Sequence, residues 1–146
     1  MTSAAKGVPL VLNRSMAPGS IIPVLGYPDV AAAARWLCAG FGFAEGLRIG
    51  DHRVQLVYGD GSPILTNAGT GEPPQHATQS VMIRGADADA HCQRTSARGA
   101  RVVQRPIDHA YGERQYTAED PWGRRWTFSQ SIADADPAAW GGVLVA

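Results

Sequence analysis

Histidines and carboxylates are the residues of this sequence that can bind metal ions or transfer protons. His52, at the start of a strand, and His76 are predicted to be solvated, and His91 is predicted to lie on the surface of a helix. His109 lies four residues before Glu113 in "DHAYGER", so these two side chains can form an acid/base pair. Nothing in the spacing singles this pair out, and a loop histidine without a role is the simpler interpretation.

Rigid aromatic side chains are the second source of binding chemistry, because flat ligands stack on them with a gain of about 0.5–1.5 kcal/mol per pair beyond area burial. Alternation along "RRWTFSQ" places Trp126 and Phe128 on one face of a strand, as core. Thr127 and Arg125 then share the opposite face, where a ligand would lie. The aromatic side chains considered are Trp36, Tyr58, Tyr111, Tyr116, Trp122, Trp126 and Phe128.

Two aromatics and one arginine stand out among the binding candidates. Trp122 lies in a turn and Tyr111 in a loop, so both are better placed to stack on a ligand than Trp126 is. Arg114 can hold a ligand carboxylate or phosphate through its planar guanidinium group. A structural ion pair from Arg114 to Glu119 or Asp120 is an equally good interpretation, and both stay open.

Composition limits the class of protein. The chain has 146 residues, enough for one domain with a real core. Lys plus Arg and Asp plus Glu number 13 each, and this zero net charge argues against a nucleic-acid partner. No apolar run approaches the roughly 20 residues of a membrane span, and the N-terminus is a poor signal peptide. Cys38 and Cys92 are predicted to be reduced thiols within helices of a cytoplasmic protein.

The same order of elements occurs twice along the chain. "SIIPVLGY" and "QSVMIRG" are predicted strands, and each precedes a helix that an aspartate caps, Asp29 in the first copy and Asp87 in the second. Three short strands follow each helix, with turn signals at Asp60-Gly61 and around Gly123. Two segments would have to agree by chance to produce this repeat, so it outweighs any single assignment.

The repeat predicts an α+β fold in which two βαβββ modules form paired curved mixed sheets around a cleft. The expected organisation is one structural domain, with a short strand at Val8–Leu12 and a short helix or arm at the C-terminus. Its parts are an N-terminal arm (1–19), a first module (20–70), a linker (71–78), a second module (79–132) and a tail (133–146).

The repeat, together with "YPDVAAAARWLCAGFGF", "GARVVQRP" and "YGERQYTAEDPWGRRWTFSQ", resembles the vicinal oxygen chelate superfamily over roughly residues 20–132. That group includes glyoxalases, extradiol dioxygenases and bleomycin-resistance proteins. The resemblance implies that metal ligands come from the first and last strand of each module. It also implies that the loop of His109 lies at the edge of the cleft.

Counting from the two capping aspartates and the two turn glycines gives the positions that would hold metal ligands. They are Ile22, Leu65, Ser80 and Thr127. A divalent cation prefers imidazole or carboxylate donors, so two aliphatic and two hydroxyl side chains are not expected to hold one. A shift of one or two residues offers only the weak neutral donors Asn67, Gln79 and Gln130. No metal and no cofactor are therefore expected.

Two classes of function follow from the resemblance. The favoured class is a non-catalytic protein that binds a flat or aromatic small molecule, such as an antibiotic, as metal-free bleomycin-resistance proteins do. It implies a homodimer, and residues 1–19 are a candidate for an arm exchanged between subunits. The alternative is a glyoxalase-, lyase- or dioxygenase-type enzyme that uses a metal or an acid/base pair. The candidate ligand-binding residues are Tyr58, His109, Tyr111, Arg114, Trp122, Arg125 and Thr127.

Overall fold

The computed structural model describes residues 11–17, 19–68 and 79–145, and within them the predicted repeat is confirmed. The first module consists of β1 (Val24–Tyr27), α1 (Val30–Phe41), β2 (Ala44–Ile49), β3 (Arg53–Val57) and β4 (Ile64–Asn67). The second consists of β5 (Ser80–Arg84), α2 (Ala88–Ala97), β6 (Arg101–Asp108), β7 (Glu113–Glu119) and β8 (Arg125–Ser131). The predicted linker, 71–78, lies outside the described residues.

Both helices begin as the sequence predicts. The side chain of Asp29 accepts a hydrogen bond from Ala32 N, and that of Asp87 accepts one from Ala90 N, each at 3.0 Å. These bonds satisfy backbone donors that the first turn of a helix leaves unpaired. Gly42 ends α1 in the left-handed conformation, at φ +88°.

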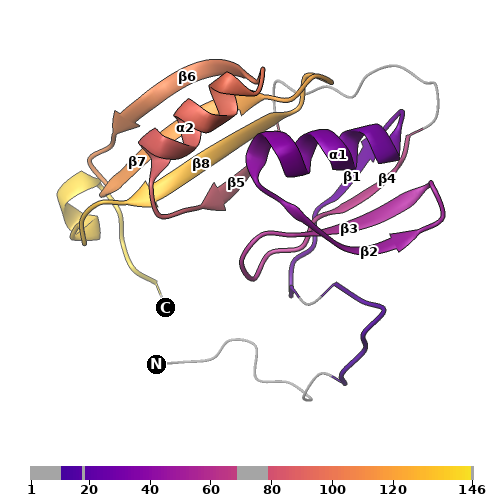
Figure 1. Ribbon diagram of the computed structural model, residues 1–146. Helices are drawn as coiled ribbons and strands as arrows, with labels where there is room; N and C mark the ends of the chain where they lie inside the picture. Colours follow the sequence, from indigo (N-terminus) through magenta and orange to yellow (C-terminus); the bar gives the residue numbers. More distant parts are fainter. Residues whose placement is uncertain (1–10, 18, 69–78, 146) are drawn as a thin grey trace.

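Each module folds into a four-stranded mixed sheet, in the orders β1-β4-β3-β2 and β5-β8-β7-β6. The first and last strands of each module pair in parallel, and the other pairs are antiparallel. Figure 1 shows both helices on the same side of the two sheets. Here we call the opposite side of each sheet its open face.

The core lies between the helices and the sheets and runs through both modules. Phe41 and Phe43, at the end of α1, contact Trp126 of β8 at ring-centroid distances of 5.8 and 5.4 Å. Trp126 is fully buried and Phe128 is 3% exposed, so the prediction that these two aromatics belong to the core is confirmed. Their burial leaves the alternate residues of β8 on the open face.

A buried aspartate also joins the two modules. Asp120 Oδ2 accepts hydrogen bonds from the Tyr27 hydroxyl at 2.6 Å and from Trp126 Nε1 at 3.1 Å. Asp120 Oδ1 accepts from the backbone N–H groups of Trp122 and Arg124, both at 3.0 Å. Burial, followed by the charge of Asp120, raises the pKa of Tyr27, so its hydroxyl stays protonated and keeps donating.

The two ends of the chain take different courses. In the described part of the N-terminal arm, Ser15 O accepts a hydrogen bond from Gln55 Nε2 of β3 at 3.0 Å, so the arm contacts its own first sheet at this residue. Residues 11 and 12 are not in a strand, and the rest of the predicted strand Val8–Leu12 lies outside the described residues. The tail contains the 3-10 helix η1 (Pro137–Trp140), beside the end of the second sheet (Figure 1). No helix in the described part of the chain is both long and apolar enough to cross a membrane.

Candidate ligand-binding site on the second sheet

The open face of the second sheet has a polar floor whose groups are hydrogen-bonded to one another. The hydroxyls of Thr117 and Thr127 are 2.8 Å apart across β7 and β8. Further along, Ser129 Oγ donates to Glu113 Oε1 at 2.6 Å and accepts from Gln115 Nε2 at 3.0 Å. Cross-strand pairs of this kind fix side-chain positions, so the floor is largely preorganised.

An aromatic wall stands at one end of this floor. The rings of His109 and Tyr111 are stacked, with centroids 4.9 Å apart and an interplanar angle of 10°. Tyr111 also contacts Trp140 of η1 at 5.4 Å, and its hydroxyl donates to Gln115 Oε1 at 3.0 Å. The wall and the floor enclose an open cavity of about 450 Å³, lined by Met82, Arg84, Tyr111, Glu113, Gln115, Ser129 and Trp140.

One charged group of the cavity has a defined protonation state. Hydrogen bonds from Ser129 and Ser131 lower the pKa of Glu113, and the positive charge of Arg84 lowers it further. Glu113 is therefore a carboxylate at neutral pH and acts as a hydrogen-bond acceptor. The described residues show no hydrogen bond between the side chains of His109 and Glu113, which are joined through the backbone by His109 N and Glu113 O at 2.8 Å.

The positions that would hold a metal in the resembling family do not fit one here. Thr127 Oγ1 is hydrogen-bonded to the Thr117 hydroxyl. In the register of β5 and β8, Ser80 lies beside Arg125 rather than beside Thr127. Ile22 precedes β1 and offers no donor atom. Within the described ranges, no group of three or more His, Cys, Asp or Glu side chains is placed to hold an ion.

The assignment of Leu65 to the ligand-bearing face of the first sheet is wrong. Leu65 is fully buried in the core, and so its neighbours Ile64 and Thr66 face the open side. The reason is the length of the turn. The β3–β4 hairpin closes between Tyr58 and Gly61, whereas the β7–β8 turn closes between Asp120 and Arg124. A difference of one residue moves a side chain to the other face of a strand.

Arg125 lies on the open face, as alternation predicts, and takes part in an ion pair. Its Nε is 3.2 Å from Glu119 Oε2, and Glu119 also pairs with Arg101 at 2.9 Å. Arg125 and Thr127 lie along β8, beyond the residues that line the cavity.

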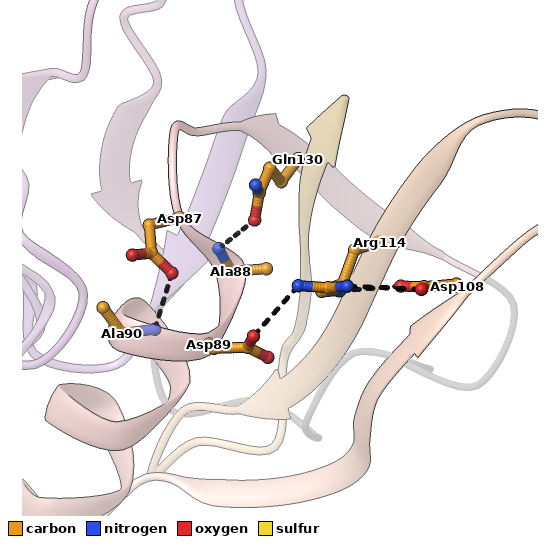
Figure 2. Close-up of polar contacts among 7 residues, drawn as sticks. All are labelled: Asp87, Ala88, Asp89, Ala90, Asp108, Arg114 and Gln130. Atoms are coloured by element: carbon orange, nitrogen blue, oxygen red, sulfur yellow. Dashed lines mark hydrogen bonds and ion pairs between the residues drawn. The ribbon is translucent and has the colours of Figure 1, made fainter. Parts of the chain in front are cut away.

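Arg114 is not among the residues that line the cavity, and Figure 2 shows its guanidinium group between Asp89 and Asp108. Its guanidinium group bonds Asp108 at 2.7 Å and Asp89, in the first turn of α2, at 3.1 Å. The structural interpretation was therefore right about the kind of contact but wrong about the partners, Glu119 and Asp120. Alternation along β7 explains this, because Arg114 shares the helix-covered face with Tyr116 and Ala118. Gln130, on the same face of β8, accepts a hydrogen bond from Ala88 N.

Trp122 and Tyr58 lie away from the aromatic wall. Trp122 packs edge-on against Tyr27 of the first module, with centroids 5.4 Å apart. Tyr58 contacts Phe43 at 5.3 Å and lines a second cavity of about 430 Å³ between the β3–β4 hairpin and β5. This cavity shares Met82 and Arg84 with the first one. The structure thus brings His109 and Tyr111 together, whereas neither Tyr58 nor Trp122 lines the cavity beside Tyr111.

The prediction that His91 lies on the surface is also wrong. His91 is only 8% exposed, because α1 and the second sheet cover this face of α2. Its Nε2 donates to Phe41 O at 2.8 Å, and its Nδ1 accepts from the Tyr116 hydroxyl. Burial lowers the pKa of His91, with a smaller contribution from Arg94, so the imidazole is neutral in the folded protein.

Sequence reasoning missed Trp140 and Met82 as residues of the cavity. Local signals for the turn that carries Trp140 are present, because Asp136 caps η1, Pro137 begins it and Gly141 ends it at φ +93°. These signals predict a helical turn but not where the turn packs. Met82 is 59% exposed on an outermost strand, and its apolar side chain gave no indication of a binding role.

Two βαβββ modules, with a candidate site on an open sheet face, define the general class of this protein. The model of the Glyoxalase/Bleomycin resistance protein/Dioxygenase superfamily matches residues 21–128, and the chain belongs to this family. No curated protein matches the chain significantly.

Several solved structures are similar to this chain, and some of them carry the names of this superfamily. TioX from Micromonospora sp. ML1 is 32% identical, with a TM-score of 0.67 over 78% of this chain and 100% of that one. A glyoxalase/bleomycin resistance protein from Streptomyces sp. CB03234 is 25% identical, with a TM-score of 0.63 over 75% of this chain and 97% of that one. A glyoxalase/bleomycin resistance protein/dioxygenase from Nocardioides, at 18% identity and a TM-score of 0.67, covers 88% of this chain and 90% of that one and shares the fold.

Proposed function

We propose that this protein binds a flat, partly aromatic small molecule on the open face of its second sheet and releases it unchanged. The observation that carries the proposal is the cavity of about 450 Å³ in which an aromatic wall meets a polar floor. Cavities that combine apolar walls with a few oriented polar groups are typical small-molecule sites.

The chemistry of the floor favours binding over catalysis. The hydroxyls of Thr117 and Thr127 are hydrogen-bonded to each other, and Ser129 donates to Glu113 and accepts from Gln115. The donor set is poor for a divalent cation, which supports a function without metal or cofactor. Sequestration without chemistry is also the activity implied by the resemblance to metal-free bleomycin-resistance proteins, and an antibiotic is one ligand of the required shape.

Binding and turnover are tested together with three flat probes, lumichrome, proflavine and anthracene-9-carboxylate. After treatment with a chelator, the protein is expected to bind at least one probe with micromolar or lower Kd, and mass spectrometry is expected to recover that probe unchanged. Met82→Arg places a charge against the cavity and is expected to weaken binding by at least about tenfold, or about 1.4 kcal/mol.

Arg114→Gln is the matched control, because Arg114 faces α2 and lies outside the cavity. It is expected to leave the Kd unchanged. The enzymatic alternative would be favoured if binding required added divalent metal. It would also be favoured if the protein converted a probe, or the adduct of a probe with a thiol, into a product. Failure of all three probes to bind would contradict the proposal.

We also propose that the protein acts as a homodimer. Among the strands of the described residues, β1 and β5 are outermost in their sheets, and they expose Val24 at 56% and Met82 at 59%. Ile21, just before β1, is 89% exposed. Apolar side chains along such strand edges favour association with a second copy.

Light scattering at low micromolar concentration is expected to give the mass of two chains. Val24→Lys is expected to shift the protein toward monomer, because it places a charge on the free edge. Asp51→Lys, at an exposed position in the β2–β3 turn, is the control and is expected to leave the measured mass unchanged. A monomer in the wild type would count against the dimer.

A further inference from the structure

The C-terminal tail places an aromatic ring at the candidate site. Asp136 Oδ1 accepts from Ala138 N at 3.1 Å, and Gly142 N donates to Pro137 O at 2.7 Å, so both ends of η1 are closed by hydrogen bonds. Trp140 at the end of this turn contacts Tyr111 and is 45% exposed. A large aromatic side chain held at a cavity and left half-exposed has a free surface for a ligand.

The position of the tail depends on Gly112. Gly112 O accepts hydrogen bonds from Ile132 N at 2.9 Å and Ala133 N at 3.3 Å. Gly112 has φ +83°, and a Cβ built on it would lie 2.5 Å from Ala133 O. Only glycine permits this approach, so the turn that carries Tyr111 also holds the start of the tail.

The side of the cavity opposite Trp140 and the floor of the cavity determine which ligands fit. Met82 of β5 also lines the cavity, and a thioether side chain packs well against flat rings. On the floor, Glu113 is ionised and accepts from Ser129 and Ser131. A carboxylate has about four acceptor positions, which leaves room for a ligand donor.

From this arrangement we propose that the C-terminal segment is part of the ligand site. Trp140, held against Tyr111 by the Gly112 turn, forms a wall that selects a flat ring whose edge carries an N–H donor for Glu113. This inference rests on the proposed function and adds to it the class of ligand and the residues that determine specificity.

The first test removes the wall. Trp140→Ala is expected to weaken lumichrome binding by about tenfold, since stacking and apolar contact are lost together, whereas Trp140→Phe is expected to restore part of the affinity. Trp36→Phe, on α1 and outside the cavity, is the control and is expected to keep the wild-type Kd. Trp140 is on the surface, so Trp140→Ala and Trp140→Phe are both expected to keep the wild-type melting temperature.

The second test separates positioning from backbone strain. Gly112→Ala adds a side chain where Ala133 O lies, and Gly99→Ala adds one at φ +93° with no atom within 4 Å. Both variants carry the same kind of backbone strain. Only Gly112→Ala is expected to weaken lumichrome binding and to change the fluorescence of Trp140, because only it displaces the tail.

The third test concerns the donor edge. Lumichrome carries N–H groups, and its 1,3-dimethyl derivative has the same flat ring without them. The first is expected to bind about tenfold more tightly, and Glu113→Ala is expected to remove the difference.

If Trp140→Ala and Gly112→Ala both bind lumichrome with the wild-type Kd, this inference is overturned, but the proposed function is not. Equal affinity for the two lumichromes would also overturn it. No binding of any flat probe by the wild type would overturn the proposed function and this inference with it.

Discussion

Asp120→Ala is expected to lower the free energy of unfolding by about 3–5 kcal/mol, because one buried carboxylate serves four donors. The substitution leaves the Tyr27 hydroxyl, the Trp126 indole and two backbone N–H groups without this partner. Two of these donors belong to the turn that starts β8, and one belongs to β1 of the other module. Urea denaturation measures the loss.

Two further variants sharpen this result. Asp120→Asn keeps the side-chain shape and one carbonyl acceptor, so its loss is expected to be smaller, about 1–3 kcal/mol. Asp134→Ala removes an exposed carboxylate and is expected to change stability by less than about 0.5 kcal/mol. Equal stability of Asp120→Ala and Asp134→Ala would show that Asp120 does not join the modules.

His91→Leu is expected to lower the free energy of unfolding by about 1–3 kcal/mol at neutral pH, since Phe41 O loses its side-chain donor and the Tyr116 hydroxyl loses an acceptor. The same variant is expected to lose part of its sensitivity to acid. Thermal melts at about pH 7.5 and about pH 5, on either side of the ordinary histidine pKa, test both effects.

The direction of the pH effect follows from the lowered pKa of His91. Between that lowered value and about 6.5, the unfolded chain binds more protons at this site than the folded protein does. The contribution of neutral His91 to stability is complete above about pH 6.5 and is lost as the pH falls toward the folded-state pKa. The cation of Arg94 disfavours a second positive charge here. Thr95 and Tyr116, which also face the ring, give no compensating negative charge at these pH values.

His52→Gln is the control for this measurement. His52 is exposed in the β2–β3 turn, so its substitution is expected to change the free energy of unfolding at neutral pH by less than about 0.5 kcal/mol. A His91→Leu variant with the same pH dependence as the wild type would contradict the assignment of a neutral buried imidazole.

The fold could be predicted from the sequence because its signals repeat. Asp29 and Asp87 each cap a helix, and alternation correctly placed Trp126 in the core and Thr127 on the open face. These features depend on residues close together in the chain. The class of fold and the family follow from their order.

The site was less predictable because its contacts join distant segments. Leu65 was misplaced by a difference in turn length, and His91 was misplaced because α1, from the other module, covers its helix face. Arg114 pairs with Asp89 of α2, on the helix-covered face of the second sheet. Trp140 enters the site through a tail whose course depends on Gly112, and no periodicity in the tail indicates that packing.

The central claim, capture of a flat ligand on the open face without a metal, is tested most directly by backbone NMR. Lumichrome is added to chelator-treated protein, and amide shifts are followed. The account predicts changes concentrated at Tyr111, Glu113, Gln115 and Trp140, with little change along α1 and α2. Shifts confined to the helix-covered face, or binding that appears only after a divalent metal is restored, would contradict it.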